Sequence, residues 1–184
     1  MTTESILKGK YILAVDDEKD ILDTIEDILH DVKLDKAGDY ETASEKIRNN
    51  TYDYVILDIM GVKGLTLLEE AVERNIPAIM LTAHAMNADT LIESIRKGAI
   101  SYIPKETLAD LDELLAELIQ AHEAGEPPWK LLFDRFGDFY DKRFGSDWKE
   151  NNKDFWDDFS KTFHIGKGIQ NRLLKDPDIA GKGI

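Results

Sequence analysis

Short apolar runs alternate with amphipathic segments through the first two thirds of the chain. Runs such as residues 11–15 and 54–57 are too short for independent helices and rich in β-branched and aromatic residues, so they predict buried strands. The segments between them repeat apolar residues at helical spacing, as Ile21, Ile25 and Leu29 do. The predicted strands cover residues 11–15, 32–37, 54–57, 77–81 and 100–103, and the predicted helices cover residues 21–29, 40–48, 65–74, 89–97 and 106–122. Five strand–helix repeats favour a doubly wound α/β fold with a parallel sheet and right-handed crossovers.

The pattern changes after residue 124. Two helical stripes of apolar residues follow, and together they contain most of the aromatic side chains of the chain: Trp129, Leu132, Phe133, Phe136, Phe139 and Tyr140, then Trp148, Phe155, Trp156, Phe159 and Phe163. Pro127-Pro128 precedes the first stripe and Gly145-Ser146 follows it, which predicts a helical hairpin with an aromatic seam. The seam either packs internally and against the first part, or forms a surface for a partner or a second copy of the chain.

Composition supports a division into two modules at Gly125-Glu126-Pro127-Pro128. Residues 125–184 hold 11 basic and 11 acidic residues, so the formal charge of −14 lies entirely in residues 1–124. All 3 Trp and all 7 Phe lie after residue 128. We therefore expect one domain over residues 1–124 and a small α-helical extension over residues 125–184. Residues 161–184 are basic on balance and repeat Gly-Lys-Gly-Ile, and we expect them to be loosely ordered.

Several classes of protein are disfavoured by the same composition. The chain has no Cys, which excludes disulfides and thiolate metal sites. It has no signal-peptide pattern and no run of 18 apolar residues, so we expect a cytoplasmic protein without membrane insertion. The acidic first part repels polyanions and argues against nucleic acid as its partner.

Polar side chains follow four of the predicted strands at the same end. Asp16 and Asp17 follow the first strand, Asp58 the third, Thr82 the fourth and Lys105 the fifth. A single Asp at a strand end commonly caps a turn, but here the carboxyl ends of parallel strands bring all these groups to the ligand-binding edge of the sheet. Three carboxylates so close repel one another unless a cation offsets their charge. Mg²⁺ fits oxygen donors, whereas the lack of Cys and the scattered His residues disfavour zinc.

With these groups at the strand ends, the chain resembles the receiver domain of bacterial response regulators. The resemblance covers about residues 9–122 and rests on four motifs in order: Ala14-Val15-Asp16-Asp17-Glu18, Ile56-Leu57-Asp58-Ile59-Met60, Met80-Leu81-Thr82-Ala83-His84 and Ser101-Tyr102-Ile103-Pro104-Lys105. It implies a flavodoxin-like five-stranded sheet of order 2-1-3-4-5. It also implies that the chain is a regulatory phosphoacceptor of a two-component phosphorelay and not a conventional enzyme.

The resemblance further implies a role for each motif residue. Asp58 would accept a phosphoryl group from a histidine kinase or a phosphotransfer protein. Asp16, Asp17, Asp58 and the Met60 backbone carbonyl would hold Mg²⁺. Lys105 would contact the phosphoryl group, and Thr82 and Tyr102 would respond to phosphorylation.

Two departures from the family pattern stand out. Lysine usually precedes proline, whereas here the order is Pro104-Lys105-Glu106, so we expect a differently shaped loop beyond the lysine. The sequence does not decide whether Ile103-Pro104 is cis. The acceptor loop lacks the proline often found after Met60. His84 is either an exposed loop residue or a side chain that affects how water reaches the phosphoryl group.

Three functions of different classes follow from these features. The first is a signalling switch in which phosphorylation of Asp58 changes protein contacts of the last helices and the extension. The second is a transcriptional regulator whose extension binds DNA, although residues 129–158 lack a basic recognition helix. The third is an aspartate-nucleophile phosphatase, which is disfavoured because Met60 stands where the acid/base carboxylate of that class would be.

Overall fold

The computed structural model describes residues 2–83 and 87–162. The predictions for His84, Phe163 and the Gly-Lys-Gly-Ile repeats lie outside these residues. The strands are β1 (Tyr11–Val15), β2 (Lys33–Ala37), β3 (Tyr54–Leu57), β4 (Ala78–Thr82) and β5 (Ser101–Pro104). The helices of the first part are α1 (Thr3–Leu7), α2 (Lys19–Ile28), α3 (Tyr40–Asn49), α4 (Gly64–Glu73), α5 (Ala88–Lys97), the 3₁₀ helix η1 (Lys105–Asp110) and α6 (Leu111–Glu123).

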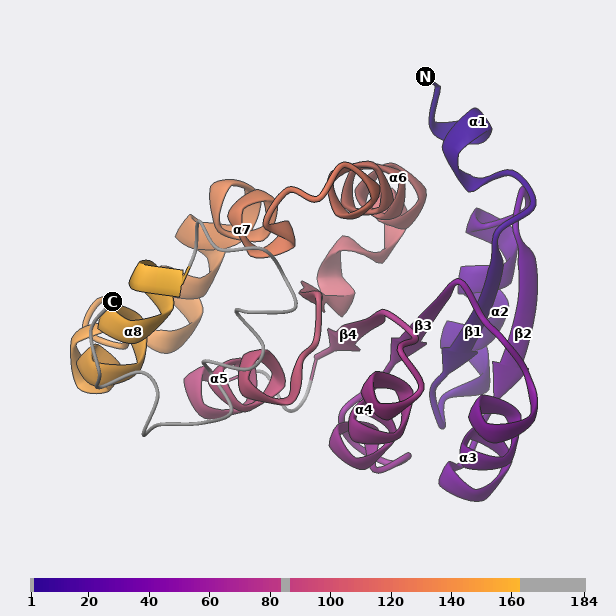
Figure 1. Cartoon of the computed structure of the whole chain (residues 1–184), viewed down its shortest axis with the longest axis horizontal. Helices are drawn as coiled ribbons and strands as arrows, with labels where there is room; N and C mark the ends of the chain where they lie inside the picture. The colour runs from indigo at the N-terminus through magenta and orange to yellow at the C-terminus, as the bar shows by residue number, and fades with distance from the viewer. Residues whose placement is uncertain (1, 84–86, 163–184) are drawn as a thin grey trace.

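The five strands form one parallel sheet in the order β2-β1-β3-β4-β5, as predicted (Figure 1). The central strands β3 and β4 are buried along their whole length, which explains their continuous apolar sequences. Strand β2 carries the charged residues Lys33, Asp35 and Lys36 and is only partly buried, consistent with its position at the edge of the sheet.

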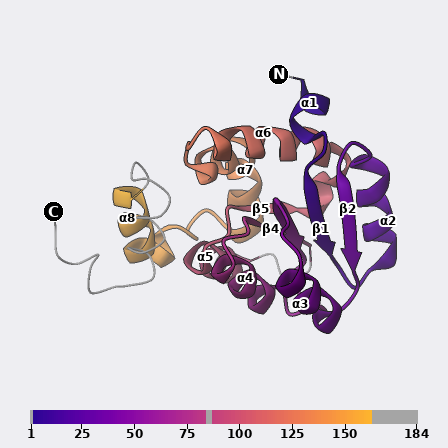
Figure 2. The same cartoon turned by 45° about the vertical axis from the view of Figure 1, so that its right-hand side comes forward.

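Helices cover both faces of the sheet. Helices α3, α4 and α5 lie side by side on one face, and α2 and α6 lie on the other (Figures 1 and 2). The amphipathic patterns predicted these layers, because each helix turns its apolar side toward the strands. In α2, for example, Leu22 and Ile25 are buried while Asp20 and Asp27 are exposed. The doubly wound arrangement is therefore confirmed.

One local prediction needs correction, one short helix was not predicted, and the isomer of one proline bond, which the sequence left open, is now determined. The helix expected over residues 106–122 begins as the 3₁₀ helix η1, and its α-helical part starts only at Leu111. Leu108 and Leu111 are both buried. A spacing of i, i+3 places two residues on one face of either an α-helix or a 3₁₀ helix, so the apolar pattern does not distinguish the two helix types. The short helix α1 was not predicted, although Thr2 accepts a hydrogen bond from the Ser5 amide as an N-cap. No cis peptide bond occurs among the described residues, so Ile103-Pro104 is trans.

The extension forms the helices α7 (Pro128–Phe144) and α8 (Lys153–Thr162), with the 3₁₀ turn η2 (Glu150–Asn152) between them. The predicted helical extension is thus present. The chain folds back on itself here, since Phe133 of α7 contacts Trp156 and Phe159 of α8 with ring centroids 5.4 and 6.2 Å apart. Trp148 lies in the connection and contacts Tyr140.

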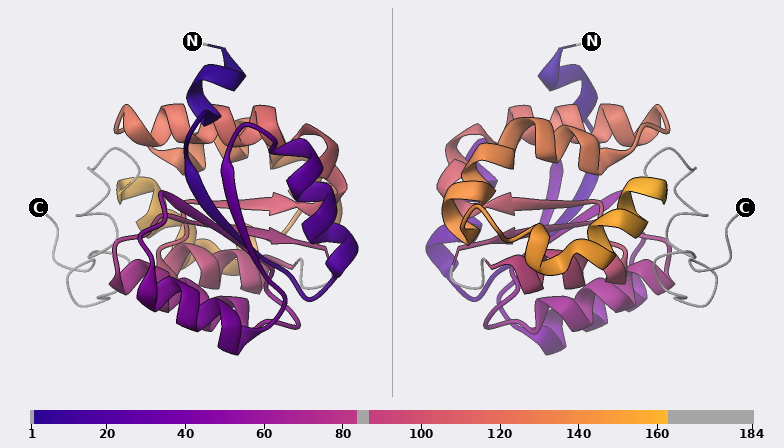
Figure 3. Two further views of the ribbon diagram at one scale, coloured as in Figure 1. Left: turned by 90° about the vertical axis from the view of Figure 1, so that its right-hand side faces the viewer. Right: turned by 90° about the vertical axis from the view of Figure 1, so that its left-hand side faces the viewer.

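Helix α7 lies along β5 and beside α6, and α8 lies beside α5 (Figure 3). Two side chains of α7 donate hydrogen bonds to backbone carbonyls of the β5 region: Trp129 Nε1 to Ala99 at 3.0 Å, and the Tyr140 hydroxyl to Tyr102. Arg96 of α5 lies 5.1 Å from the ring centre of Phe155. The extension therefore covers the edge of the sheet formed by β5.

The aromatic seam belongs to the same core as the sheet. The buried aromatic residues of the extension are Trp129, Phe136, Tyr140, Trp148, Phe155 and Phe159. Of the two interpretations of this seam, packing against the first part is the one seen in the structure. Within the described part of the chain the exposed large hydrophobic side chain is Met60, and no helix there is long and apolar enough to cross a membrane.

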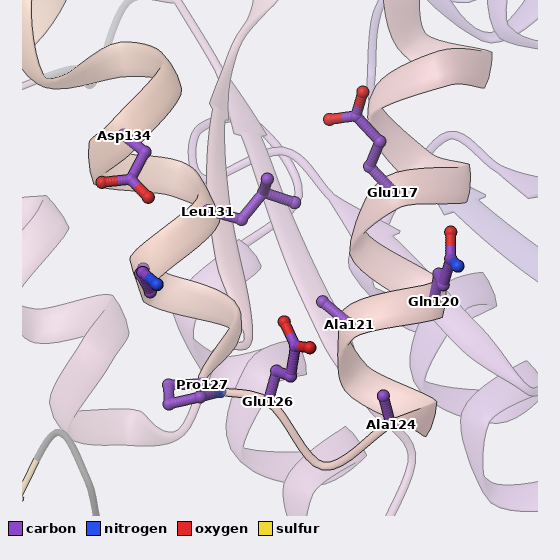
Figure 4. Close-up of a pocket in the computed structure, with 9 residues that line it drawn as sticks. Glu117, Gln120, Ala121, Ala124, Glu126, Pro127, Leu131 and Asp134 are labelled. Carbon is purple, nitrogen blue, oxygen red and sulfur yellow. The ribbon is translucent and has the colours of Figure 1, made fainter.

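A groove of about 380 Å³ separates the outer surfaces of α6 and α7 near their connection (Figure 4). Ala121 and Leu131 point into it from the two helices, and charged side chains surround these apolar residues. The rim includes Glu126 and Lys130, of opposite charge. The residues that line the groove include neither Lys105 nor the acidic cluster at the strand ends, so the groove does not form part of the candidate site.

Candidate functional site

Asp58 stands at the carboxyl end of β3, in the middle of the sheet, and is 5% exposed. Its Oδ1 accepts a hydrogen bond from the Ile59 amide at 2.9 Å. The chain then turns sharply, and a methyl group added at Gly64 would lie 1.8 Å from the Asp58 carbonyl oxygen. Only glycine lets helix α4 begin so close to this residue. The turn fixes the Asp58 side chain at the sheet edge.

Asp16 and Asp17 follow β1, the strand next to β3. Asp16 is 2% exposed and its Oδ1 accepts a hydrogen bond from the Glu18 amide at 3.0 Å, while Asp17 is exposed. Carboxylate oxygens of Asp16, Asp17 and Asp58 all lie within 4.8 Å of one another. The strand order therefore brings together the three acidic residues predicted from the sequence.

Gly61 provides the space for Asp17. Its φ is +70°, in the left-handed region, and a methyl group there would lie 2.3–2.4 Å from atoms of the Asp17 carboxylate. From the sequence, this loop was distinguished only by the lack of a proline after Met60. The packing of Gly61 against Asp17 comes from the tertiary structure, because the two residues lie on different loops.

Lys105 places its ammonium group among these carboxylates. Its side chain is 7% exposed, and its Nζ lies 2.8 Å from Asp16 Oδ2 and 3.6 Å from Asp58 Oδ2. A further carboxylate, Glu18, accepts a hydrogen bond from the same Nζ at 3.0 Å. Glu18 is part of the first motif, but no role was predicted for it. Its position directly after Asp16-Asp17 is the sequence feature that could have indicated a role at the site.

The buried charges shift the pKa values of the site. Burial raises the pKa of Asp58 to about 6, with Asp16 and Asp17 adding to the shift and Lys105 opposing it. Burial also raises the pKa of Asp16, against the effect of its hydrogen bond from Lys105. For Lys105, burial alone would lower the pKa, but the hydrogen bonds to Asp16 and Glu18 outweigh it and the pKa is raised. The carboxylates thus carry an excess of negative charge that the lysine only partly offsets.

Thr82 ends β4, beside the acceptor strand. Its side chain is fully buried, and its hydroxyl has no hydrogen-bond partner among the described residues. A buried hydroxyl without a partner is costly and calls for an explanation such as a ligand or a second state. This property fits a hydroxyl that gains a partner when a negatively charged group is added to Asp58.

Tyr102 lies on β5 with its ring buried. Its hydroxyl and Thr90 Oγ1 of α5 are 2.8 Å apart and share a hydrogen bond, and burial raises the pKa of Tyr102 to about 12. Its ring contacts Tyr140 of α7 edge-on, with centroids 6.3 Å apart. Tyr102 therefore links α5, β5 and the extension.

Met60 completes the predicted set. Its side chain is 55% exposed beside the acidic residues, and its carbonyl accepts a hydrogen bond from the Val62 amide at 2.7 Å. A carbonyl oxygen has two lone pairs, so one remains for a cation. This geometry is compatible with the predicted ligand role of the carbonyl.

The donor set fits a hard divalent cation. Three carboxylates with converging oxygens suit Mg²⁺, and their combined formal charge exceeds the single positive charge of Lys105. Within residues 2–83 and 87–162, the Asp16, Asp17 and Asp58 group is the cluster whose geometry could hold a metal ion. Asp16, Asp17 and Asp58 are therefore the residues that would hold Mg²⁺.

Comparison with known families agrees with this geometry. The model of the response regulator receiver domain matches residues 12–119, which is more than half of the chain and includes every strand. The chain belongs to the response regulator receiver family. The resemblance stated from the sequence is thus confirmed, and residues 128–162 add helices beyond the matched segment.

Individual relatives extend this result. The transcriptional regulatory protein DltR of Streptococcus agalactiae is 38% identical over 113 residues, covering 58% of this chain and 49% of DltR. The response regulator ArlR of Staphylococcus saprophyticus is 33% identical, covering 71% of this chain and 60% of ArlR. The chain thus matches only about half of the length of such relatives. A CheY-like receiver domain from Methanospirillum hungatei superposes with a TM-score of 0.58 at 29% identity, covering 64% of this chain and 98% of that structure.

Proposed function

We propose that this chain is a phosphorylation switch of a two-component phosphorelay. Asp58 accepts a phosphoryl group from a histidine kinase or a phosphotransfer protein, and the extension transmits the change to a protein target. Residues 1–124 form the phosphoacceptor domain in this proposal and residues 125–184 its output element. The observation that carries the proposal is the convergence of Asp58, two further carboxylates and Lys105 beside the Thr82 hydroxyl, which has no hydrogen-bond partner in the described part of the chain.

The phosphoryl transfer uses groups present at the site. A carboxylate oxygen of Asp58 attacks phosphorus, the P–N bond of the donor phosphohistidine breaks, and the leaving imidazole nitrogen keeps the electron pair and takes up a proton. Mg²⁺, when bound, would neutralise charge on the phosphoryl oxygens. Lys105 lies close enough to move toward the same oxygens. The negative charges of Asp16 and Asp17 attract the cation. The buried position of Asp58 excludes bulk water from the acceptor.

The conformational response begins at Thr82. A phosphoryl group on Asp58 offers oxygens that can accept a hydrogen bond from the Thr82 hydroxyl, which would draw the end of β4 inward. Thr82→Ala protein should therefore still accept phosphate but show a smaller change in hydrogen exchange over residues 83–97. An undiminished change in that variant would refute the role of Thr82.

The extension is placed to receive this response. The Tyr140 hydroxyl donates to the Tyr102 carbonyl, and the Tyr102 hydroxyl is bonded to Thr90 at the start of α5. A shift of Tyr102 or α5 would therefore change the contacts of α7. Truncation after Gly125 should change the labelling rate of Asp58 or the oligomeric state, measured by phosphodonor labelling and light scattering. Identical behaviour of the two forms would mean that the extension acts independently of the switch.

Labelling by a small phosphodonor tests the central proposal. Full-length protein with phosphoramidate and Mg²⁺ should gain one phosphoryl group, located on Asp58 by mass spectrometry. Asp58→Asn should abolish labelling and keep the fold, while Asp27→Asn, which changes an exposed aspartate of α2, should be labelled normally. Equal labelling of Asp58→Asn and the parent would show that Asp58 is not the acceptor.

A DNA-binding role is the second candidate, and it is favoured by the names of relatives such as DltR and the phosphate regulon protein PhoB of Klebsiella pneumoniae. In the described extension, however, α7 and α8 cover β5 and α5, and their exposed sides mix acidic residues such as Asp134 and Asp154 with basic residues such as Lys142. A gel-shift assay with mixed genomic fragments at low and physiological salt distinguishes the candidates. Salt-sensitive, sequence-selective binding would favour the DNA-binding role.

A further inference from the structure

Lys105 is shared by three carboxylates, and the acceptor is the most distant of them. Its Nζ lies 2.8 Å from Asp16 and 3.0 Å from Glu18, but 3.6 Å from Asp58. The ammonium is therefore hydrogen-bonded on the side of β1 and only within electrostatic reach of Asp58. To contact a phosphoryl group there, it must move away from at least one of its present partners.

Glu18 differs from the other two carboxylates. It lies outside the cluster of Asp16, Asp17 and Asp58 that would hold the metal, and its side chain is 52% exposed. It occupies the N-cap position of α2, yet its carboxylate makes no capping hydrogen bond to that helix. Glutamate is not among the residues whose side chains usually cap a helix. Here the carboxylate reaches instead to a lysine 87 positions along the chain.

The geometry points to Glu18 as a positioning residue for Lys105, an inference that rests on the function proposed above. While Asp58 is unphosphorylated, Glu18 keeps the Lys105 ammonium close to Asp16. A contact that exists in the resting state and is stretched in the transition state slows the reaction. Glu18 thus restrains phosphorylation of Asp58 by limiting how readily Lys105 moves to the incoming phosphoryl oxygens. No bond to Glu18 is made or broken in the transfer.

Two substitutions distinguish the effect of the position of the Glu18 carboxylate from the effect of its charge. Glu18→Gln removes the charge, whereas Glu18→Asp keeps the charge but shortens the side chain by one methylene. If Glu18 acts by holding Lys105, both variants should label with phosphoramidate roughly 1.5- to fivefold faster than the parent at saturating Mg²⁺, the range expected for loss of a half-exposed ion pair. Glu106→Gln is the matched control, because it removes the same charge from an exposed residue next to Lys105.

The effect must also depend on the lysine. In a Lys105→Met background, Glu18→Asp should no longer change the labelling rate, since the group that it positions is absent. A parent-like rate for Glu18→Asp with a faster Glu18→Gln would mean that Glu18 acts through its charge alone. An acceleration that persists in the Lys105→Met background would also overturn the inference.

A measurement on metal-free, unphosphorylated protein keeps this inference separable from the proposed function. The ammonium resonance of Lys105, observed by ¹⁵N-lysine NMR, should shift in Glu18→Asp and stay in place in Glu106→Gln. An unmoved resonance in Glu18→Asp refutes the positioning role whatever the labelling shows. A parent protein that phosphoramidate does not label would instead refute the proposed function.

Discussion

The carboxyl edge of the sheet and the contact between α7 and β5 are built in opposite ways, although Tyr102 borders both. At the sheet edge, three carboxylates converge around one ammonium group, and the buried Thr82 hydroxyl has no partner among the described residues. At the α7 contact, aromatic rings pack together and the polar groups of Trp129 and Tyr140 are hydrogen-bonded.

The difference separates a site that is ready to change from a contact in which the polar groups of Trp129 and Tyr140 are already paired. Buried like charges and an unpaired hydroxyl cost stability, and a cation or an added phosphoryl group would reduce that cost. Buried aromatic side chains with paired polar groups stabilise the fold by roughly 1.5–3 kcal/mol each before ordering costs. We infer that function is concentrated at the first region and stability at the second, and four predictions test this contrast.

The largest expected effect on stability is at Tyr140. Tyr140→Ala should lower the free energy of unfolding by about 3–5 kcal/mol, because it removes a fully buried ring and its hydrogen bond to β5. Tyr140→Phe keeps the ring and should cost only about 1 kcal/mol. Urea unfolding followed by circular dichroism measures both. Equal stability of Tyr140→Ala and the parent would show that α7 does not stabilise the sheet.

Asp17 should show the reverse pattern. Asp17→Ala removes an exposed carboxylate, so the free energy of unfolding should change by less than about 0.5 kcal/mol, while phosphoramidate labelling should fall roughly 100-fold through weaker Mg²⁺ binding. Raising the Mg²⁺ concentration should restore part of the rate. Asp20→Ala, at another exposed aspartate nearby in sequence, serves as the control. Unchanged labelling would remove Asp17 from the metal site.

The charge on Asp58 should destabilise the metal-free protein. Because burial raises its pKa to about 6 in the folded state, against about 4 for an unfolded chain, the ionised form is disfavoured in the fold above pH 6. The free energy of unfolding of Asp58→Asn should therefore exceed that of the parent by about 1–3 kcal/mol at pH 8 in EDTA. This gain should disappear below pH 4, where Asp58 of the parent is neutral in both the folded and the unfolded chain. Urea unfolding at the two pH values measures the difference, and saturating Mg²⁺ should reduce it at pH 8. A gain that is independent of pH would contradict the burial of an ionised Asp58.

The smallest effect is expected at Thr82. Thr82→Val replaces the hydroxyl with a methyl group of similar size, so it removes an unpaired polar group and should stabilise the unphosphorylated protein by about 1 kcal/mol. Thr42→Val is a contrasting control, because the Thr42 hydroxyl donates to Asp39 and its loss should destabilise the protein. Thermal unfolding in parallel would detect the opposite signs. Destabilisation by Thr82→Val would show that its hydroxyl already has a partner.

Much of the site at the carboxyl edge of the sheet could be predicted, because its predicted residues follow apolar runs. Tyr54 to Leu57 is apolar throughout and Asp58 is not, so the end of the strand and the position of the carboxylate are set together. Helix boundaries were less predictable. Leu108 and Leu111 suit an α-helix and a 3₁₀ helix equally, and the sequence pattern therefore missed the 3₁₀ turn after Lys105.

The extension was predictable only in part. Its two aromatic stripes indicated helices, but the same stripes suit a hairpin, a partner-binding surface or a docked element. The covering of β5 depends on Trp129 and Tyr140 reaching carbonyls more than 25 positions away. Local periodicity contains no information on contacts between such distant residues.

The sequence by itself determined which chemical groups stand at the strand ends, because apolar runs specify the buried strands and parallel connections bring their carboxyl ends to one edge. Only the tertiary structure decided how those groups are paired. It places Lys105 nearer to Glu18 than to Asp58, leaves the Thr82 hydroxyl without a partner among the described residues, and packs Gly61 against Asp17. These relations depend on small differences in distance between groups on separate loops, such as 3.0 Å from Lys105 Nζ to Glu18 and 3.6 Å to Asp58. Side-chain packing and charge determine such differences together, and no local pattern encodes them.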